Sequence, residues 1–465
     1  MSIPAGGGSA VVATDRLSAA DLSMIWPEDF GWPQDIGAIA VLDGSVLVDA
    51  NGRFRIEEVR DQIGRRLPPL ARFRQCLYMP RRGLGWPLWV DASSVDLARH
   101  VGVFSLEAAD EAEFLSACER LRRRPLDRSR PLWELWFLPG LPQGRVGLFM
   151  KLHHAVADGV AGVAAFGAFL DLTPDAAAPS ASLQTPAPIP SNIALFRDNV
   201  SRRAQAGRTF LSRLAHPGDT VREIRRGWPA VREAFGEGRA PLTSLNRRVG
   251  SDRRLALIRS RLDVIKGIAH AQGGTVNDVL LTAVAAGLRG LLERRGEWVD
   301  GLVLRAMVPV SLHHEQPGQA RGNLDGVMMV PLPIGEPDDL RRLRWIAGET
   351  ARRKTKSRPP GGTLFRNGLI QRAFIRHAAR QRFMNVYVAN VPGPPVPLYL
   401  DGAPLLEVFP VVPIMGNLTL GVGALSYAGQ FNLTVVADRD ACPDVQVFVD
   451  EARSSLDELA RSMTP

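Results

Sequence analysis

Short apolar runs bounded by turn residues predict β-strands in both halves of the chain. In the first half, residues 36–44 form one such run, and residues 132–138 and 146–152 flank a Pro/Gly turn. In the second half, residues 255–260 and 302–310 have the same character. These strand patterns alternate along the chain with helical patterns, which favours an α/β protein over an all-β or all-helical one.

Helical periodicity fills much of the remaining sequence. Ser18, followed by an acidic residue three positions later, marks a short helix before the first strand. Residues 96–124 carry a charged helical pattern, and residues 159–172 predict a helix of small apolar residues packed on both sides. Two further helices are predicted from about Asp263 and over residues 277–291.

Residues 173–192 are rich in Pro, Ala and Ser and lack apolar periodicity, which is typical of a linker. We therefore predict a flexible tail at 1–15, an N-terminal domain at 16–172, a linker with a basic helical segment at 173–240, and a C-terminal domain at 241–465. The length of 465 residues is sufficient for two buried cores.

Residues 193–235 combine arginines with regularly spaced apolar side chains. A basic amphipathic helix can lie on an anionic membrane surface. It can equally pack its apolar face on the body of the protein, as most surface helices do. We expect the second arrangement and keep membrane contact as a hypothesis.

The chain carries a formal net charge of +9, which suits an anionic partner. Lys stands only at positions 151, 266, 354 and 356, so Arg accounts for nearly all of the 57 basic residues. A GC-rich genome explains that bias more simply than nucleic-acid binding does, and we predict no nucleic-acid partner.

The sequence predicts neither secretion nor a membrane-spanning helix. Cys76, Cys118 and Cys442 have no CxxC spacing, which fits a reducing, cytoplasmic compartment. Residues 1–16 lack the pattern of a signal peptide. The charge-free stretch 408–437 contains prolines, glycines and a turn at 428–430, so it predicts paired strands and not a transmembrane helix.

The segment HHAVADG at residues 153–159 is the strongest candidate for chemistry. It follows a predicted strand and opens a predicted helix, a place where a rigid scaffold presents side chains to a cleft. A neutral imidazole accepts protons at neutral pH, so His154 is a candidate general base. Asp158 could instead only cap the helix, and a histidine could be a core residue.

A metal site is the remaining alternative for these histidines. It would need a third or fourth ligand. The other histidine pair, His313 and His314, lies in a separate polar loop without a known metal-binding spacing. We therefore predict no metal.

HHAVADG resembles the HHxxxDG signature of the bacterial wax ester synthase/diacylglycerol acyltransferase family, part of the CoA-dependent acyltransferase superfamily that includes chloramphenicol acetyltransferase and peptide-synthetase condensation domains. Further segments resemble the PLW, ND, GN and NVPGP elements of that family, in the same order. They are Pro131-Leu132-Trp133, Asn277-Asp278, the segment around Asn323, and Asn390 to Pro394.

The resemblance implies two chloramphenicol-acetyltransferase-like halves, each a mixed sheet flanked by helices, with the active site between them. It implies that His154 is the base, that His153 and Asp158 hold the geometry, and that Gly159 gives the turn its freedom. No covalent enzyme intermediate and no bound cofactor are expected, and long-chain acyl-CoA is the co-substrate.

The other motif residues keep two interpretations each. Asn277, beside Asp278, either stabilises the oxyanion of the reacting thioester or caps a helix. Pro131, Leu132 and Trp133 either bind substrate or only pack. The NVPGP residues Asn390, Pro392 and Gly393 either line a substrate tunnel or form a rigid turn.

The family esterifies diacylglycerol or fatty alcohols, and the Arg-rich composition resembles members assigned to triacylglycerol storage, so diacylglycerol is the expected acceptor. The alternatives are a wax ester synthase, a non-catalytic lipid-binding paralogue and a condensation domain. A cytoplasmic protein, peripheral on the inner membrane or lipid droplets, fits these substrates.

One departure from the family lies near the N-terminus. Many relatives carry a Met-His-Val-Gly type segment where this chain has Gln34-Asp35-Ile36-Gly37, preceded by PEDFGWP. Access of substrate on that side is therefore expected to differ.

Overall fold

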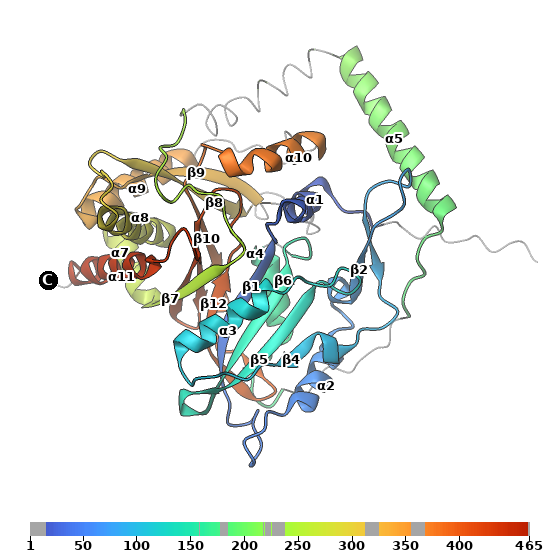
Figure 1. Cartoon of the computed structure of the whole chain (residues 1–465), viewed down its shortest axis with the longest axis horizontal. Coiled ribbons are helices and arrows are strands. Elements are labelled where there is room, and N and C mark those ends of the chain that lie inside the picture. Colours follow the sequence, from blue (N-terminus) through green and yellow to red (C-terminus); the bar gives the residue numbers. More distant parts are fainter. Residues whose placement is uncertain are drawn as a thin grey trace, which may run out of the picture.

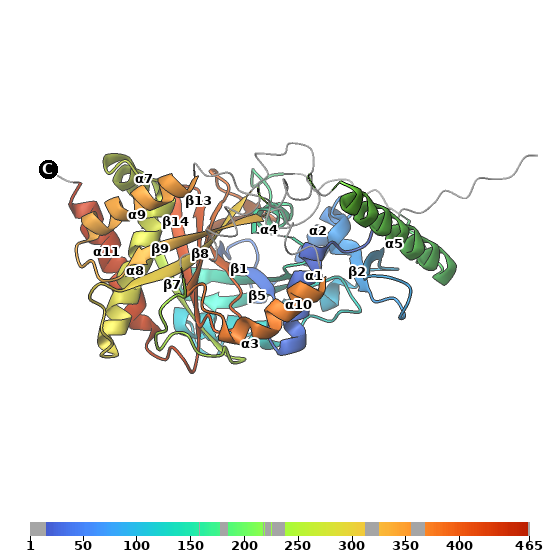
Figure 2. The same cartoon turned by 90° about the horizontal axis from the view of Figure 1, so that it is seen from above.

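Two six-stranded mixed β-sheets organise the part of the chain that the computed structural model describes (Figure 1). The described residues are 15–157, 159–176, 185–216, 218, 225, 238–311, 325–354 and 368–463. Within them, a small two-stranded sheet pairs β2 (Gln75–Tyr78) with β3 (Leu88–Asp91). Figure 2 shows the two large sheets next to each other, with helices on their outer sides.

The first sheet is antiparallel except for its last pair. Its order is β11 (Tyr399–Leu400), β12 (Ala403–Val411), β1 (Asp35–Asp43), β6 (Arg145–His153), β5 (Trp133–Leu141) and β4 (Val101–Val103). The helices of this half are α1 (Ala19–Ile25), η1 (Trp26–Phe30), α2 (Ile56–Arg66), η2 (Ala71–Arg74), η3 (Leu97–Arg99), α3 (Glu111–Arg123), η4 (Pro142–Gly144) and α4 (Gly159–Gly167).

The second sheet has parallel pairs at its centre and antiparallel pairs outside. Its order is β7 (Arg253–Arg261), β14 (Gln430–Asp438), β13 (Leu420–Tyr427), β10 (Val386–Pro392), β8 (Val303–Ser311) and β9 (Asp325–Pro333). Its helices are α7 (Leu262–Ala271), α8 (Val276–Arg294), α9 (Asp339–Lys354) and α11 (Val445–Arg461). Helix α10 (Gly368–His377), followed by η6 (Ala378–Arg380), contacts α1 and η1 of the first half. Helix α5 (Asn192–Ala215) lies between the halves in the chain.

Strand β12 links the two halves. It comes from the second half of the sequence but pairs antiparallel with β1, in the first sheet. It also packs against β13 and β14 of the second sheet. Strands β11 and β12 therefore complete the first sheet, although they fall within the predicted C-terminal domain at 241–465, and the domain boundaries stay a prediction. Strand pairing between segments so far apart in the chain leaves no local pattern in the sequence from which it could be predicted.

A hydrophobic cluster joins the two sheets into one body. It includes Ile39 of β1, Phe149 of β6, Leu257 of β7, Phe409 of β12 and Val436 of β14, all buried. Burying several such side chains, at about 1.5–3 kcal/mol each, stabilises the sheets against each other. The two sheets therefore share a buried hydrophobic core.

Most sequence predictions of secondary structure are confirmed. Ser18 caps α1 in a capping box with Asp21, and the predicted strands and the helices of the second half are present. The turn at 428–430 is also present, with φ of 43° at Ala428 and 85° at Gly429. The expected arrangement of two mixed sheets flanked by helices is confirmed as well.

Two helix predictions are wrong in part. Within residues 96–124 the only α-helix is α3, which begins after the N-cap Asp110, because residues 97–99 form the 3₁₀ helix η3 and residues 101–103 pair with β5 instead. Helix α4 is not packed on both sides, since Ala161 and Ala164 are exposed. Exposed alanines are ordinary on a helix surface, so apolar composition alone could not settle this point.

No single helix in these described ranges has the length and apolar character of a membrane span; the bent pair α7 and α8 has both only when taken together.

Candidate active site

The end of strand β6 places the two histidines on different sides of the chain. Successive side chains of a strand point to opposite faces. His153 is opposite Asp35 of β1 in the strand register and is buried, at 3% exposure. His154 follows the strand, partly exposed, and its backbone N–H donates to the carbonyl oxygen of Gln34 at 2.9 Å. Only His154 of the pair lines the cavity described below.

Two hydrogen bonds fix the ring of His153. The backbone N–H of Ala155 donates to Nδ1 at 3.0 Å, so the proton of the neutral imidazole is on Nε2. Nε2 lies 2.9 Å from Oε1 of Glu28 and donates to it. His153 is thereby held as part of the backbone turn that carries His154. This arrangement holds the ring against Glu28 and outside the cavity lining, and a positioning role for His153 stays a prediction.

Glu28 is a residue that the sequence did not reveal. It lies in the 3₁₀ helix η1, which Gly31 ends with a φ of 82°. Besides accepting from His153, its carboxylate pairs with Arg128. Burial raises the pKa of Glu28, but the hydrogen bonds from His153 and Arg128 and the positive charge of Arg128 outweigh burial, so its pKa lies below the ordinary value.

A second buried pair lies on the same face of β6 as His153. The side chain of Lys151 is fully buried, and its Nζ lies 3.4 Å from Oδ2 of Asp35. Lys151 also donates to the backbone carbonyl of Arg124. Burial raises the pKa of Asp35, more than the charge of Lys151 lowers it. Asp35, within the segment 34–37 that departs from the family, thus supplies a buried ion pair next to the turn that carries the histidines.

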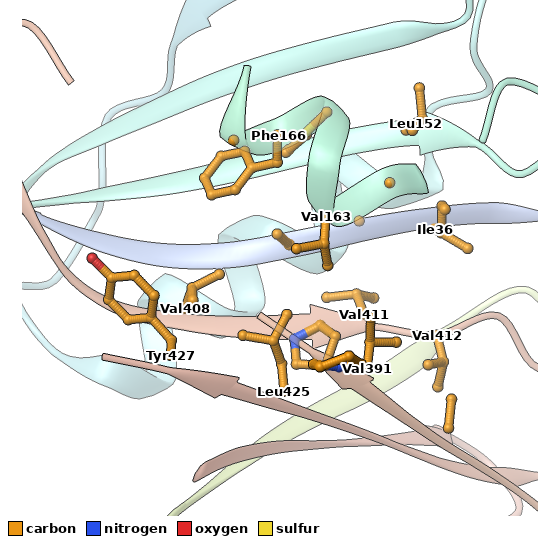
Figure 3. A pocket seen from close by; sticks show the side chains of 18 of the residues that line it. Ile36, Leu152, Val163, Phe166, Val391, Val408, Val411, Val412, Leu425 and Tyr427 are labelled. Atoms are coloured by element: carbon orange, nitrogen blue, oxygen red, sulfur yellow. The ribbon is translucent and has the colours of Figure 1, made fainter. Parts of the chain in front are cut away.

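A cavity of about 360 Å³ opens between the two sheets beside His154. Strands β1, β6, β10, β12 and β13 and helix α4 all contribute to its wall. Figure 3 shows Phe166 and Val163 of α4 on one side, with Leu425, Val391 and Val411 facing them. The wall is mainly apolar, and His154 and Asn390 bring nitrogen-bearing side chains to it. Such a cavity suits a long aliphatic chain with a reactive group near His154.

The departure segment forms part of this wall. Ile36, Gly37 and Ala38 of β1 all line the cavity. A Cβ atom on Gly37 would lie 2.3 Å from the carbonyl oxygen of Met150, so no larger residue fits there without a shift of the backbone. The effect of this segment on substrate access stays a prediction, and the structure places the segment in the cavity wall.

The NVPGP residues lie at the cavity. Asn390 and Pro392 line it directly. Gly393 sits beside them, where its backbone N–H donates to Oγ of Ser426 at 3.3 Å. A Cβ atom on Gly393 would lie 2.2 Å from the Ser426 carbonyl oxygen, which explains the need for glycine. Asn390 and Pro392 belong to strand β10, so the rigid-turn interpretation is wrong for these two residues. Their lining of a substrate tunnel stays a prediction.

The PLW residues are not among the residues that line this cavity. Trp133 has 0% exposure, its Nε1–H donates to the carbonyl oxygen of Phe73 at 2.9 Å, and its ring stacks on His100. Leu132 is buried in the same core. Pro131 forms an isolated bridge with Cys76. Their contacts are those of packing residues.

The ND residues lie at the start of α8, also outside the cavity lining. Thr275, not Asn277, is the N-cap, and Asp278 completes the capping box. Oδ1 of Asp278 also accepts from the hydroxyl of Thr350 on α9 at 2.6 Å. The capping interpretation of Asn277 is therefore wrong, because the helix starts one residue earlier; its oxyanion role stays a prediction.

Several other predicted positions fall outside the described residues, namely Asp158, His313, His314 and Asn323. Gly159 is the first residue of α4. Among the described residues, no cluster of three or more His, Cys, Asp or Glu side chains could hold a metal ion.

Turnover should depend on Glu28 through His153. We expect Glu28→Ala to lower kcat roughly 10- to 100-fold with little change in KM, because a small misplacement of the reactive turn is costly. Glu28→Gln should retain more activity, since its amide oxygen can still accept from Nε2–H. Steady-state kinetics of both variants test this; equal kcat in Glu28→Ala and the unaltered protein would refute the positioning role.

Comparison with known proteins identifies the site's relatives. The family model described as the wax ester synthase/diacylglycerol acyltransferase catalytic domain matches residues 17–280, and the C-terminal domain model of the same family matches residues 321–460. A putative diacylglycerol O-acyltransferase of Mycobacterium tuberculosis H37Rv is 32% identical, over 96% of each chain. A probable diacylglycerol O-acyltransferase of the same strain is 29% identical over 92% of this chain and 90% of its own.

Solved structures share the fold. A wax ester synthase/diacylglycerol acyltransferase from Marinobacter aquaeolei VT8 superposes with a TM-score of 0.70 at 24% identity, covering 97% of this chain and 100% of the other. The first condensation domain of the CDA synthetase gives a TM-score of 0.59 at 13% identity, covering 98% of both chains.

Proposed function

Because the chain belongs to the wax ester synthase/diacylglycerol acyltransferase family, we propose that this acyltransferase moves a long-chain acyl group from acyl-CoA to the hydroxyl of diacylglycerol, giving triacylglycerol. The observation that carries the proposal is the position of His154 in the wall of a mainly apolar cavity between the two sheets. An aliphatic chain fits the wall, and the imidazole supplies a base beside it.

In the proposed mechanism, His154 accepts the proton of the acceptor hydroxyl as its oxygen attacks the thioester carbonyl. The tetrahedral intermediate collapses, the C–S bond breaks, and the proton passes from His154 to the leaving thiolate of CoA. The acyl group goes directly from sulfur to oxygen, so no acyl-enzyme forms. His153, held by Glu28 and the Ala155 N–H, fixes the turn that aims His154.

The negative charge that grows on the thioester oxygen needs a hydrogen-bond donor. A single donor of this kind contributes about 3–4 kcal/mol to transition-state stabilisation in other enzymes. Asn390 lines the cavity together with His154, whereas Asn277 does not. We propose that Asn390 is the better placed of the two amides for this role, although the sequence singled out Asn277.

The acceptor is tested by product analysis. Purified protein with labelled palmitoyl-CoA should convert diacylglycerol to labelled triacylglycerol faster than it converts hexadecanol to labelled wax ester. The reverse preference would identify a wax ester synthase. The absence of either product would contradict the proposed activity and favour a lipid-binding role.

Diacylglycerol and fatty alcohols, the two candidate acceptors, partition into lipid phases. We therefore propose that the protein works as a peripheral protein at the surface of a membrane or lipid droplet, from which it draws the acceptor. Fractionation of cells between supernatant and lipid-bound pools tests this location.

A further inference from the structure

Helix α5 contacts the body of the protein through one face of its first turns. Leu195 is fully buried, and Nε of the buried Arg16 pairs with Asp198 at 2.5 Å. Arg16 also donates to the carbonyl oxygen of Leu195, and the side chain of Asn199 donates to the carbonyl oxygen of Gly83 at 2.7 Å. These bonds fix the rotation of the helix about its own axis.

The apolar stripe of α5 faces away from that contact. Ile193, Phe196, Val200 and Leu211 are 66%, 55%, 47% and 64% exposed. At about 100° per residue, these four positions fall within roughly 60° of one another, whereas Leu195 lies about 100° to 160° from each of them. The expectation that the helix packs its apolar face on the body is therefore wrong. Figure 1 shows α5 at the edge of the molecule, standing off the two sheets.

The charges on α5 follow the same division. Arg197, Arg203 and Arg208 are exposed and lie beside the apolar stripe on the helical wheel. Asp198 is the single acidic residue of the helix, and it lies toward the body, where Arg16 and Arg202 of the same helix both pair with it. The outward face is thus apolar along its middle and positive along its edges, which is the pattern of a helix that lies in a lipid interface.

We propose that the outward face of α5 docks on an anionic lipid surface, with Phe196 and Leu211 inserted among the acyl chains and Arg197 and Arg208 at the headgroups. A second copy of the chain fits less well, because a symmetric contact would bring two arginine-flanked faces together. An anionic leaflet supplies the missing negative charge. The inference rests on the geometry of α5 and is independent of the acceptor preference.

Vesicle sedimentation tests the proposal with the full chain. The unaltered protein should sediment with phosphatidylcholine vesicles that contain about 30% phosphatidylglycerol, and much less with phosphatidylcholine alone. Phe196→Ser/Leu211→Ser should lower the partition coefficient on anionic vesicles at least about tenfold. The matched control is Trp298→Ser, which removes an 80% exposed aromatic outside α5 and should bind as the unaltered protein does.

Ester formation from substrates dispersed in detergent separates docking from catalysis. The double variant should retain that activity, since α5 does not line the cavity. Undiminished vesicle binding by the double variant would overturn the proposal, as would equal binding of the unaltered protein to both kinds of vesicle. Size-exclusion chromatography gives a further test. If the unaltered protein is a dimer and the double variant is a monomer, the proposal is overturned, because the apolar stripe would then be a protein interface.

Discussion

Replacing His154 by alanine is expected to lower kcat for ester formation by ~10²- to 10⁴-fold, the usual contribution of a general base. KM for acyl-CoA should change little, because the apolar wall of the cavity remains. Initial rates with labelled acyl-CoA and the preferred acceptor measure both quantities. The expected loss is in kcat and not in KM, because the imidazole of His154 acts only in the step that deprotonates the hydroxyl.

The control for this variant is His270→Ala, which removes an exposed histidine from α7. It should retain the kcat of the unaltered protein. Thermal unfolding of both variants shows whether each is folded. A His154→Ala protein that is folded and turns over at the same rate as His270→Ala would remove His154 from the mechanism.

The second large effect concerns stability at the buried pair. Lys151→Met leaves the carboxylate of Asp35 buried without its cationic partner, and such a loss costs about 3–5 kcal/mol of the free energy of unfolding. Denaturant unfolding at pH 7 measures it. The double variant Lys151→Met/Asp35→Asn should recover most of the loss, because no uncompensated charge is then buried.

The pH dependence of this variant has a definite sign. Burial raises the pKa of Asp35 even beside Lys151, and without Lys151 the pKa should rise further. A carboxyl group whose pKa is raised on folding contributes its full stability at pH values below its unfolded-state pKa. That contribution is lost as the pH rises through the folded-state pKa. The stability gap between Lys151→Met and the unaltered protein should therefore narrow as the pH falls from 7 toward 4. A gap that stays constant would show that the loss comes from packing.

Local patterns predicted the reactive segment well. His153 and His154 end an apolar run that is a strand, and the turn at 428–430 joins two strands as expected. These features depend on neighbours in the sequence, so period and turn residues suffice. The separation of the two histidines into a buried and a cavity-lining residue also follows from the alternation of a strand.

Contacts between distant segments could not be predicted in the same way. Glu28 contacts His153 across 125 positions of sequence, and β12 joins a sheet whose other long strands come from the first half. The direction of the α5 stripe depends on Arg16, far away in the chain. Periodicity shows that a helix has an apolar face, but only tertiary contacts show what that face meets.

Shared motifs likewise did not separate packing from chemistry. Trp133 and Asp278 belong to segments that match the family, yet their contacts are with the core and with α9. Asn390 matches too, and it lines the cavity. A motif shows that a position is used in the family, whereas the role depends on the surroundings of the side chain.

The central claim is that His154 removes the proton of the acceptor hydroxyl, and the most direct measurement varies the acidity of that hydroxyl. The kcat ratio of the unaltered protein to His154→Ala is compared for a fatty alcohol and for its analogue fluorinated next to the hydroxyl-bearing carbon. A more acidic hydroxyl needs a base less, so the ratio should fall markedly for the fluorinated acceptor. An equal ratio for both acceptors would contradict proton removal by His154.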